Sequence, residues 1–537
     1  MNLSLPTDTN LSKTEILIGL LEHGLFAEKL PPCFTSKGLI AAIGTSLDFL
    51  LSESDPQKLK KALDKRTHDF ARYSVLRDIN VPRQFGIPHP EGYAIQCLFI
   101  REHWNEIRKH NSQPTFQVSR VHVRRLGSGK IFMMNYQGMH RFELEEEEIR
   151  WAAGSTHVAV ADISACFPSI YTHSIPWALH GRTNSKQKRG LLQLSGNVLD
   201  KTTQGLRDGQ TNGLLIGPHS SNVISEIVLT QVDKRLLNAG YQKLKRYIDD
   251  YHYYADSYDD AERFIRELGL ALREFELNIN EKKTRIQQLP QPIEENWVRE
   301  INRFSFPADR PVSFSSVRSF LDLALELAEK AGTSSPLNYA FKMLPKNLNP
   351  RAKRLLVQEA INLSLLFPYL APVLGPYIFE QHEYVGIEGP ITDFANKLAK
   401  QGIKRIYPDA IAHSLYYGIK YDCLLTLTDE EFRQIIELND CIANVLLLEY
   451  ATKNRLAGVM KLLKKQANAL KVPSLPVGDV DRQWLFVYQM WNEADLRSAG
   501  QSFLADLKKQ NFCFINRNAF SRTAPSQAGI ATSSYSS

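Results

Sequence analysis

The sequence predicts an α+β fold: an antiparallel sheet with helices in residues 1–300, followed by an all-helical region in residues 301–518. Two runs rich in aromatic and β-branched residues flank Asp249 and Asp250, which is typical of a β-hairpin. A short apolar run ends at Asp162 and is typical of a buried strand. In the second region apolar residues recur at helical spacing, which favours stacked helical pairs.

The composition indicates a multidomain globular protein. A chain of 537 residues is expected to hold about two to four domains, and 43% hydrophobic residues suffice for sizeable cores. The net charge of +7 is compatible with a phosphate-bearing partner but does not require one. The six cysteines lack metal-finger spacing, which argues against structural zinc and favours a reducing compartment. Without a signal core or membrane-length apolar run, a cytoplasmic protein with no membrane partner is expected.

The N-terminal segment is predicted to be helical. Ser12 and Glu15 form a capping-box pattern ahead of an apolar face, and Gly24 is expected to end that helix. Residues 85–90 are expected to be extended, because each proline disfavours helix in the residue before it. A second apolar helix follows, and His89 is interpreted as a polar loop residue.

Residues 116–136 are predicted to form a basic hairpin. Arg120 and Arg124 share one face of its first strand. Arginine forms forked hydrogen bonds to phosphate oxygens, so both are candidate nucleotide-binding residues that cover a triphosphate. The alternative is the solvated face of an edge strand, which charges often protect from pairing.

Three carboxylates are the candidate catalytic centre. Asp162 ends its strand, and Asp249 and Asp250 are placed at the tip of the second hairpin. Adjacent side chains in extended chain point apart, so Asp249 is predicted to be the main metal ligand of the pair. Carboxylate oxygens suit Mg²⁺, and two such ions can hold the attacking and leaving oxygens of a phosphoryl transfer. The alternative is a solvated turn and an unrelated aspartate.

Two further positions are candidates for nucleotide binding. Phe167 follows Asp162 by less than two helical turns, and its ring can lie under a sugar and exclude a 2′-hydroxyl; the alternative is a core phenylalanine. Gly217 and Pro218 form a turn before an apolar helix, where glycine permits close backbone approach to an anion. This second pattern is common and weak by itself.

The chain then passes from sheet to helices. A helix over about 259–275 and a loop over 277–284 are predicted to lead into another strand, with Lys283 as a cation near a leaving pyrophosphate. Four prolines in 287–311 indicate a domain boundary. Residues 519–537 are rich in small and hydroxyl residues and are predicted to be a mobile tail.

The order of these motifs resembles the palm of a reverse transcriptase over about residues 70–300, and the run 247–250, Tyr-Ile-Asp-Asp, is the most specific mark. The resemblance implies that Asp162, Asp249 and Asp250 are catalytic metal ligands, with the Ile163 carbonyl near the second metal. It likewise implies that Phe167 is the sugar gate and that Lys283 lies near the phosphates.

One departure from the reverse transcriptase pattern concerns the glycine turn. Many members have Leu-Pro-Gln-Gly there, whereas this chain has Leu-Leu-Ile-Gly at 214–217. The missing glutamine helps to hold template or incoming nucleotide in those members. Its absence argues against ordinary templated copying.

The long helical region and the run 85–90, Phe-Gly-Ile-Pro-His-Pro, resemble the AbiK-like bacterial abortive infection reverse transcriptases, in particular the type carried by the P-two prophage. The resemblance implies reverse-transcriptase fingers and palm followed by a HEAT-like helical domain. It implies phage defence and template-independent synthesis from dNTPs with two Mg²⁺ ions, for which Mn²⁺ can substitute. It also implies a homo-oligomer and a protein primer, to which the single-stranded DNA product stays covalently attached.

Two alternatives remain open. One is a templated RNA-directed DNA polymerase of the retron or intron type, which a co-purifying structured RNA would favour. The other is a catalytically silent nucleic-acid-binding scaffold, against which the three acids argue. The priming residue is unknown: residues 1–72 contain no tyrosine, and Tyr535 in the tail is one possibility.

Overall fold

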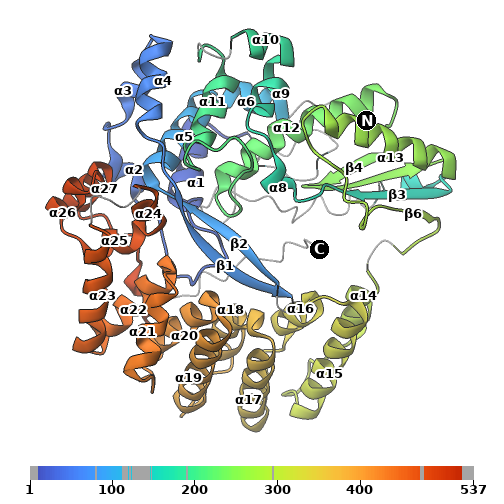
Figure 1. The fold of residues 1–537 in the computed structure, drawn as a ribbon. Helices are drawn as coiled ribbons and strands as arrows, with labels where there is room; N and C mark the ends of the chain where they lie inside the picture. The colour runs from blue at the N-terminus through green and yellow to red at the C-terminus, as the bar shows by residue number, and fades with distance from the viewer. Residues whose placement is uncertain are drawn as a thin grey trace.

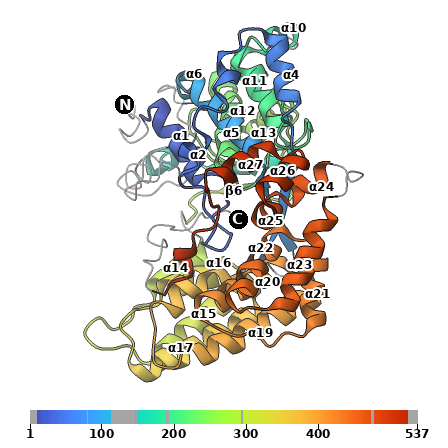
Figure 2. The ribbon, with the colours of Figure 1, turned by 90° about the vertical axis from the view of Figure 1, so that its left-hand side faces the viewer.

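The protein has two lobes, with the sheet and its helices in one and an arc of helices in the other (Figures 1 and 2). This description comes from a computed structural model. It describes residues 10–78, 81–111, 148–188, 192–292, 295–471 and 477–522, together with residues 119, 123 and 146. The predicted basic hairpin with Arg120 and Arg124 lies outside the described residues, as does Tyr535.

The N-terminal segment is helical, as predicted. Ser12 and Glu15 form both bonds of a capping box at the start of α1 (Lys13–His23), and Gly24 caps its end. The helices that follow are α2 (Leu39–Ile43), α3 (Asp48–Ser52) and α4 (Pro56–Asp64). The chain then forms a long antiparallel ribbon of β1 (Phe70–Asp78) and β2 (Val81–Pro88), followed by α5 (Pro90–Glu102) and α6 (Trp104–Asn111).

The second sheet is antiparallel and has four strands in the order β4-β5-β3-β6. Its strands are β3 (His157–Asp162), β4 (Leu244–Tyr247), β5 (Asp250–Ala255) and β6 (Arg285–Gln288). Helix α13 (Tyr258–Arg273) packs against β3 and β5 because Ala261, Phe264 and Leu268 lie on its buried face. Helix α12 (His219–Asn238) packs beside α13. The predicted strand that ends at Asp162, the predicted second hairpin, the strand after the 277–284 loop and the helix before β6 are confirmed.

The tip of the β4–β5 hairpin differs from the prediction. Tyr247 pairs with Asp250, so the two-residue turn consists of Ile248 and Asp249, and Asp250 is the first residue of β5. Ile248 has a φ of 54°, a strained conformation for a β-branched residue. The expectation that both aspartates lie at the tip was wrong, because the register of β4 against β5 takes Asp250 into the ladder.

Between β3 and α12 the described residues form four short helices. These are α8 (Cys166–Ser169), α9 (Ser174–His180), α10 (Arg182–Gln187) and α11 (Ser195–Gln204). Helices α9, α10 and α11 lie at the end of the first lobe that is farthest from the arc of helices (Figure 1).

The rest of the described chain is helical, which confirms the predicted helical region. Its helices are α14 (Asn296–Arg303), α15 (Phe314–Ala331), α16 (Ser335–Met343), α17 (Pro350–Leu366), α18 (Ala371–Leu374), α19 (Glu388–Arg405), α20 (Pro408–Lys420), α21 (Asp429–Glu437), α22 (Cys441–Lys453), α23 (Ala457–Ala469), α24 (Val477–Arg482), α25 (Trp484–Met490), α26 (Glu493–Ser498) and α27 (Ser502–Lys509). Two short 3₁₀ helices, η4 (Pro368–Leu370) and η6 (Arg517–Phe520), and one short π-helix, η5 (Gly375–Phe379), complete it. None of the described helices is both long and apolar enough to span a bilayer.

The β1–β2 ribbon joins the two lobes (Figure 1). On β1 the backbone N–H of Leu76 donates to the buried Asp409 carboxylate of α20 at 3.1 Å. At the end of β2 the Ile87 carbonyl accepts from the indole N–H of Trp484 at 3.2 Å. Hydrogen bonds buried in this way are costly to leave unmade, so the ribbon and the helical region form one packed unit.

Candidate active site

The structure brings the three predicted carboxylates to one end of the second sheet. Asp162 is the last residue of β3, and its cross-strand partner in register is Asp250. The N–H of Ile163 donates to the Asp249 carbonyl at 3.1 Å, which holds the hairpin turn against the end of β3. Asp162 is 6% exposed, whereas Asp249 and Asp250 are half-buried. The sequence pattern identified all three residues.

Asp162 is held by the loop that precedes β6. The side-chain amide of Asn280 donates to Oδ1 of Asp162 at 3.0 Å, and Nζ of Lys283 lies 2.9 Å from Oδ2. The backbone N–H of Asn280 also donates to the Asp162 carbonyl at 2.7 Å. The sequence pattern identified Lys283 but missed Asn280, whose only signal was its place in the same short loop.

The carboxylates repel one another. Burial, together with the charge of Asp162, raises the pKa of Asp249. Burial and the neighbouring charges of Asp249 and Asp162 raise the pKa of Asp250 to about 7. The nearby cation Lys283 opposes both shifts without cancelling them. The centre therefore has an excess of negative charge that a bound cation would neutralise.

The donor set fits a hard divalent cation. Asp162, Asp249 and Asp250 all offer oxygen atoms, the ligands that Mg²⁺ and Mn²⁺ prefer over nitrogen and sulfur. These three carboxylates are the residues that would hold such an ion, with the Ile163 carbonyl as the predicted additional oxygen.

A buried arginine supports the hairpin that carries Asp249 and Asp250. Arg246 is fully buried, and its guanidinium bonds Glu226 at 2.8 Å and Asp233 at 2.8 Å. It also donates to the carbonyl of Ile248, the strained turn residue, at 2.8 Å. Two buried carboxylates on α12 thus fix the turn through one guanidinium. No sequence pattern singled out Arg246, because its partners are distant in the chain.

Two other predicted nucleotide-binding residues, Phe167 and Gly217, lie on segments that are joined by a hydrogen bond. Phe167 is half-buried on α8, and its carbonyl accepts from Leu214 N–H at 2.7 Å, which ties α8 to the segment before the glycine turn. Gly217 has a φ of 124°, and a Cβ there would lie 3.1 Å from the Cβ of Ala27. The backbone conformation and the tight space therefore both favour glycine at this position.

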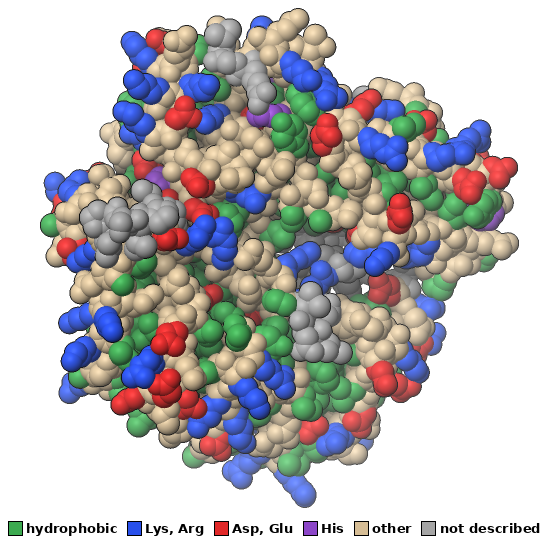
Figure 3. All heavy atoms as spheres, in the orientation of Figure 1, with side chains coloured by type: hydrophobic (Ala, Val, Ile, Leu, Met, Phe, Trp, Pro, Cys, Tyr) green, Lys and Arg blue, Asp and Glu red, His purple; other side chains and the backbone are tan. Residues whose placement is uncertain are grey.

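The sequence reasoning missed one cation that interacts with the carboxylates. Arg83 on β2 is exposed and interacts electrostatically with Asp249. Lys and Arg side chains also gather in the hollow between the two lobes (Figure 3). Arg83 is thus a candidate for binding the triphosphate, the role that the sequence assigned to Arg120 and Arg124.

The three carboxylates lie in a segment of the chain that matches a known protein family. Residues 77–314, which contain all three carboxylates, match the family described as "Reverse transcriptase (RNA-dependent DNA polymerase)". We call this matched segment the reverse transcriptase domain. Domains of this family generally depend on divalent metals, in agreement with the oxygen-rich centre.

Other comparisons add little. No curated protein matches the chain. A solved structure described as apo telomerase from Candida tropicalis is similar over 74% of this chain and 68% of that chain, at 8% identity and a TM-score of 0.32. That likeness is too weak to bear on function.

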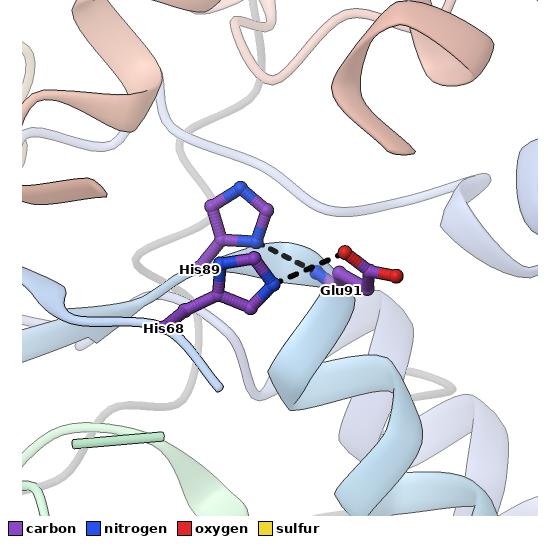
Figure 4. A group of neighbouring side chains, drawn as sticks. All are labelled: His68, His89 and Glu91. Atoms are coloured by element: carbon purple, nitrogen blue, oxygen red, sulfur yellow. Dashed lines mark hydrogen bonds and ion pairs between the residues drawn. The ribbon is translucent and has the colours of Figure 1, made fainter. Parts of the chain in front are cut away.

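A second cluster of potential metal ligands lies between the reverse transcriptase domain and the helical region (Figure 4). His68, His89 and Glu91 have candidate ligand atoms within 4.8 Å of one another. His68 bonds Glu91 at 3.0 Å and Asp481 at 3.3 Å, while His89 bonds Gln501 at 2.9 Å and accepts from the Glu91 N–H. All four imidazole nitrogens are therefore hydrogen-bonded, which fits a structural cluster better than a metal site. We call this hydrogen-bonded cluster the histidine clasp.

His89 is not the polar loop residue that the sequence suggested. It is 1% exposed and caps α5, and its ring stacks on His68 with centroids 3.9 Å apart. The prediction was wrong because Gln501, distant in sequence, covers this position. Burial and the neighbouring His68 lower the pKa of His89 to about 3, so it stays neutral.

We expect His68 in the histidine clasp to make the free energy of unfolding depend on pH. Burial opposes charging of His68, but hydrogen bonds to Asp481 and Glu91 outweigh it and raise its pKa to about 9. Because the folded pKa lies above the unfolded value of about 6.5, the stabilisation is complete below pH 6.5 and is lost as pH rises through 9. The shift corresponds to about 3 kcal/mol.

The measurement is the free energy of unfolding by urea across this pH range in the parent and in His68→Gln. The variant should lose the part of the pH dependence that His68 supplies. Equal slopes in the two proteins would show that His68 is not charged in the histidine clasp.

Proposed function

We propose that the reverse transcriptase domain transfers deoxynucleotides from dNTPs to a hydroxyl group, using Mg²⁺. The observation that carries this proposal is the convergence of Asp162, Asp249 and Asp250 at the ends of paired strands inside that domain. Divalent ions bound there would supply charge stabilisation at the reacting phosphate. The new bond joins the hydroxyl oxygen to the α-phosphorus, and pyrophosphate leaves.

Residues of this chain have distinct tasks in that reaction. The three carboxylates hold the cations. Asn280 and Lys283 fix the orientation of Asp162, and Lys283 is the candidate to give a proton to the leaving pyrophosphate. Arg83, which interacts electrostatically with Asp249, provides a cation for the triphosphate. Phe167 restricts the sugar to the deoxy form.

The finer proposal is an antiphage abortive infection enzyme that starts DNA without a template. It acts as a homo-oligomer and joins single-stranded DNA covalently to a hydroxyl of its own chain. Two features support this reading: the turn at 214–217 lacks the glutamine of templated enzymes, and a long helical region follows the reverse transcriptase domain. A protein hydroxyl serves as primer if it reaches the carboxylates in line with the α-phosphate.

The test uses purified protein, Mg²⁺ and labelled dNTPs with no added template or primer. We expect label to migrate with the protein under denaturing conditions and to migrate faster after protease digestion. Mn²⁺ should replace Mg²⁺, and a chelator should abolish labelling. DNA that separates from the protein on denaturation alone would contradict covalent priming. Incorporation that requires added or co-purified RNA would indicate templated synthesis.

The sugar gate gives a separate prediction. Phe167→Ala should open space beside the sugar and raise the use of ribonucleotides relative to deoxyribonucleotides. The measurement is the ratio of the two incorporation efficiencies in variant and parent. Phe306→Ala is the matched control, because Phe306 is also half-buried but packs on Phe304 in the segment after α14. An unchanged ratio in Phe167→Ala would mean that Phe167 only fills the core.

A further inference from the structure

Two cavities lie side by side on the first lobe, away from the catalytic carboxylates. They share Trp177 and Arg182, and their volumes are ≈ 260 Å³ and ≈ 560 Å³. The smaller one is also lined by Tyr171, His173, Lys186, Asn197, Asp200 and Glu276. The larger one is also lined by Gln231, Lys234, Arg235, Asn238, Glu274 and Phe275. We call the two cavities together the Trp177 groove; it runs across α9, α10 and α12.

Trp177 and Arg182 stack on each other and separate the two cavities of the Trp177 groove. The guanidinium of Arg182 lies 4.4 Å from the centroid of the Trp177 ring, and its edge is 3.7 Å from Glu276. The ring of Tyr171 meets Trp177 edge-on with centroids 5.7 Å apart. Aromatic rings and guanidinium planes of this kind are surfaces on which nucleobases stack.

The carboxylates of the groove are already engaged. Asp200 bonds His173 at 2.5 Å and Gln204 at 2.6 Å. Glu274 pairs with Arg235, and Glu276 lies beside Arg182. Glu274 and Glu276 therefore lie next to cations that offset their charge, and Asp200 is held by hydrogen bonds.

Two lysines in the groove have no such partner. Within the described part of the chain, neither Lys186 nor Lys234 has a carboxylate within ion-pair distance; Lys186 lies over Trp177 and Lys234 bonds His110. One lies in each cavity, on either side of the Trp177–Arg182 pair. A ligand that neutralises both must carry repeated negative charges and cross the stacking surface between them.

We propose that the Trp177 groove binds single-stranded nucleic acid, with bases against the Trp177–Arg182 pair and phosphates at Lys186 and Lys234. The amides of Gln231 and Asn238 suit base edges, which favours a nucleic acid over an acidic peptide. The inference rests on the proposed function in that the strand is one the reverse transcriptase domain makes or copies. It adds a binding site outside the catalytic centre.

The first measurement is a photo-cross-link to the full-length protein. A single-stranded DNA oligonucleotide containing 5-iodouracil is irradiated with the protein in the absence of metal and dNTPs, and the linked peptide is identified by mass spectrometry. Cross-links at Trp177 or Tyr171 are expected. Cross-links confined to peptides outside the groove would overturn the proposal.

The second measurement is the affinity for a fluorescent single strand as a function of salt. Arg182→Glu/Lys186→Glu should weaken binding several-fold, because it removes the cation of the stacking pair and the phosphate contact at Lys186. The lost phosphate contact should reduce the salt slope by about 0.7. Lys461→Glu/Lys465→Glu on α23 is the matched control, since both lysines are exposed and one helical turn apart. Lys186→Glu alone, which keeps the Arg182–Glu276 contact, guards against loss of folding.

The outcomes separate this proposal from the catalytic one. Asp249→Asn should still bind the strand and cross-link at the groove although it incorporates no nucleotide. Equal affinity in the groove variant and the α23 control would overturn the groove and leave the proposed catalysis standing. A parent protein that cross-links at Trp177 but incorporates no dNTP would support the groove and contradict the proposed catalysis. Stronger competition by polyglutamate than by DNA would assign the groove to an acidic peptide.

Discussion

Replacing Asp249 by asparagine is expected to lower nucleotide incorporation by at least about 10²–10³-fold, the usual cost of removing one electrostatic element from a reaction centre. The variant loses a full negative charge where the cations must bind. Asp162→Asn should have the same effect. Incorporation of labelled dNTPs by the purified proteins, at equal protein concentration, measures both.

The fold of Asp249→Asn should survive, because the lost charge is one that repels its neighbours. The charge of Asp249 helps to raise the pKa of Asp250, so the pKa of Asp250 should fall from about 7 toward its usual value in the metal-free variant. Asp259→Asn, an exposed carboxylate in the first turn of α13, is the matched control and should keep full activity. Nucleotide incorporation that persists in a well-folded Asp249→Asn protein would contradict the assignment of Asp249 as a catalytic residue.

Replacing Arg246 by alanine is expected to lower the free energy of unfolding by about 3–5 kcal/mol. The change leaves Glu226 and Asp233 buried without their counter-charge and frees the Ile248 carbonyl. It should also reduce incorporation, because the turn that carries Asp249 loses its support. Guanidinium chloride unfolding curves of variant and parent measure the stability loss.

A matched surface change separates this effect from the loss of any arginine. Arg303→Ala on α14, whose side chain is 69% exposed, should change stability by no more than about 0.5 kcal/mol. Adding Asp233→Asn to Arg246→Ala should recover part of the loss, because one uncompensated charge disappears. If Arg246→Ala lowers the free energy of unfolding as little as Arg303→Ala does, the ion pairs of Arg246 with Glu226 and Asp233 do not hold the hairpin.

Local sequence patterns predicted most of the strands and helices around the candidate site and the three candidate carboxylates. Strand, turn and helix signals depend on residues a few positions apart, so β3, the β4–β5 hairpin, α13 and the capping box of α1 were all predictable. The same holds for Asp162, Asp249 and Asp250, since each stands at the end of a strand or in its turn. Lys283 was predictable for the same reason, as the loop before β6 is short.

The tertiary structure alone decided which residues meet across long stretches of chain. The register of β5 against β3 places Asp250, rather than the turn residue Asp249, opposite Asp162. The carboxylate partners of Arg246 lie on α12, and Gln501, the side chain that His89 bonds, lies in the helical region, so no local pattern marks either residue. The physical reason is that buried polar groups must find partners wherever the fold supplies them, and those partners are not encoded in nearby positions.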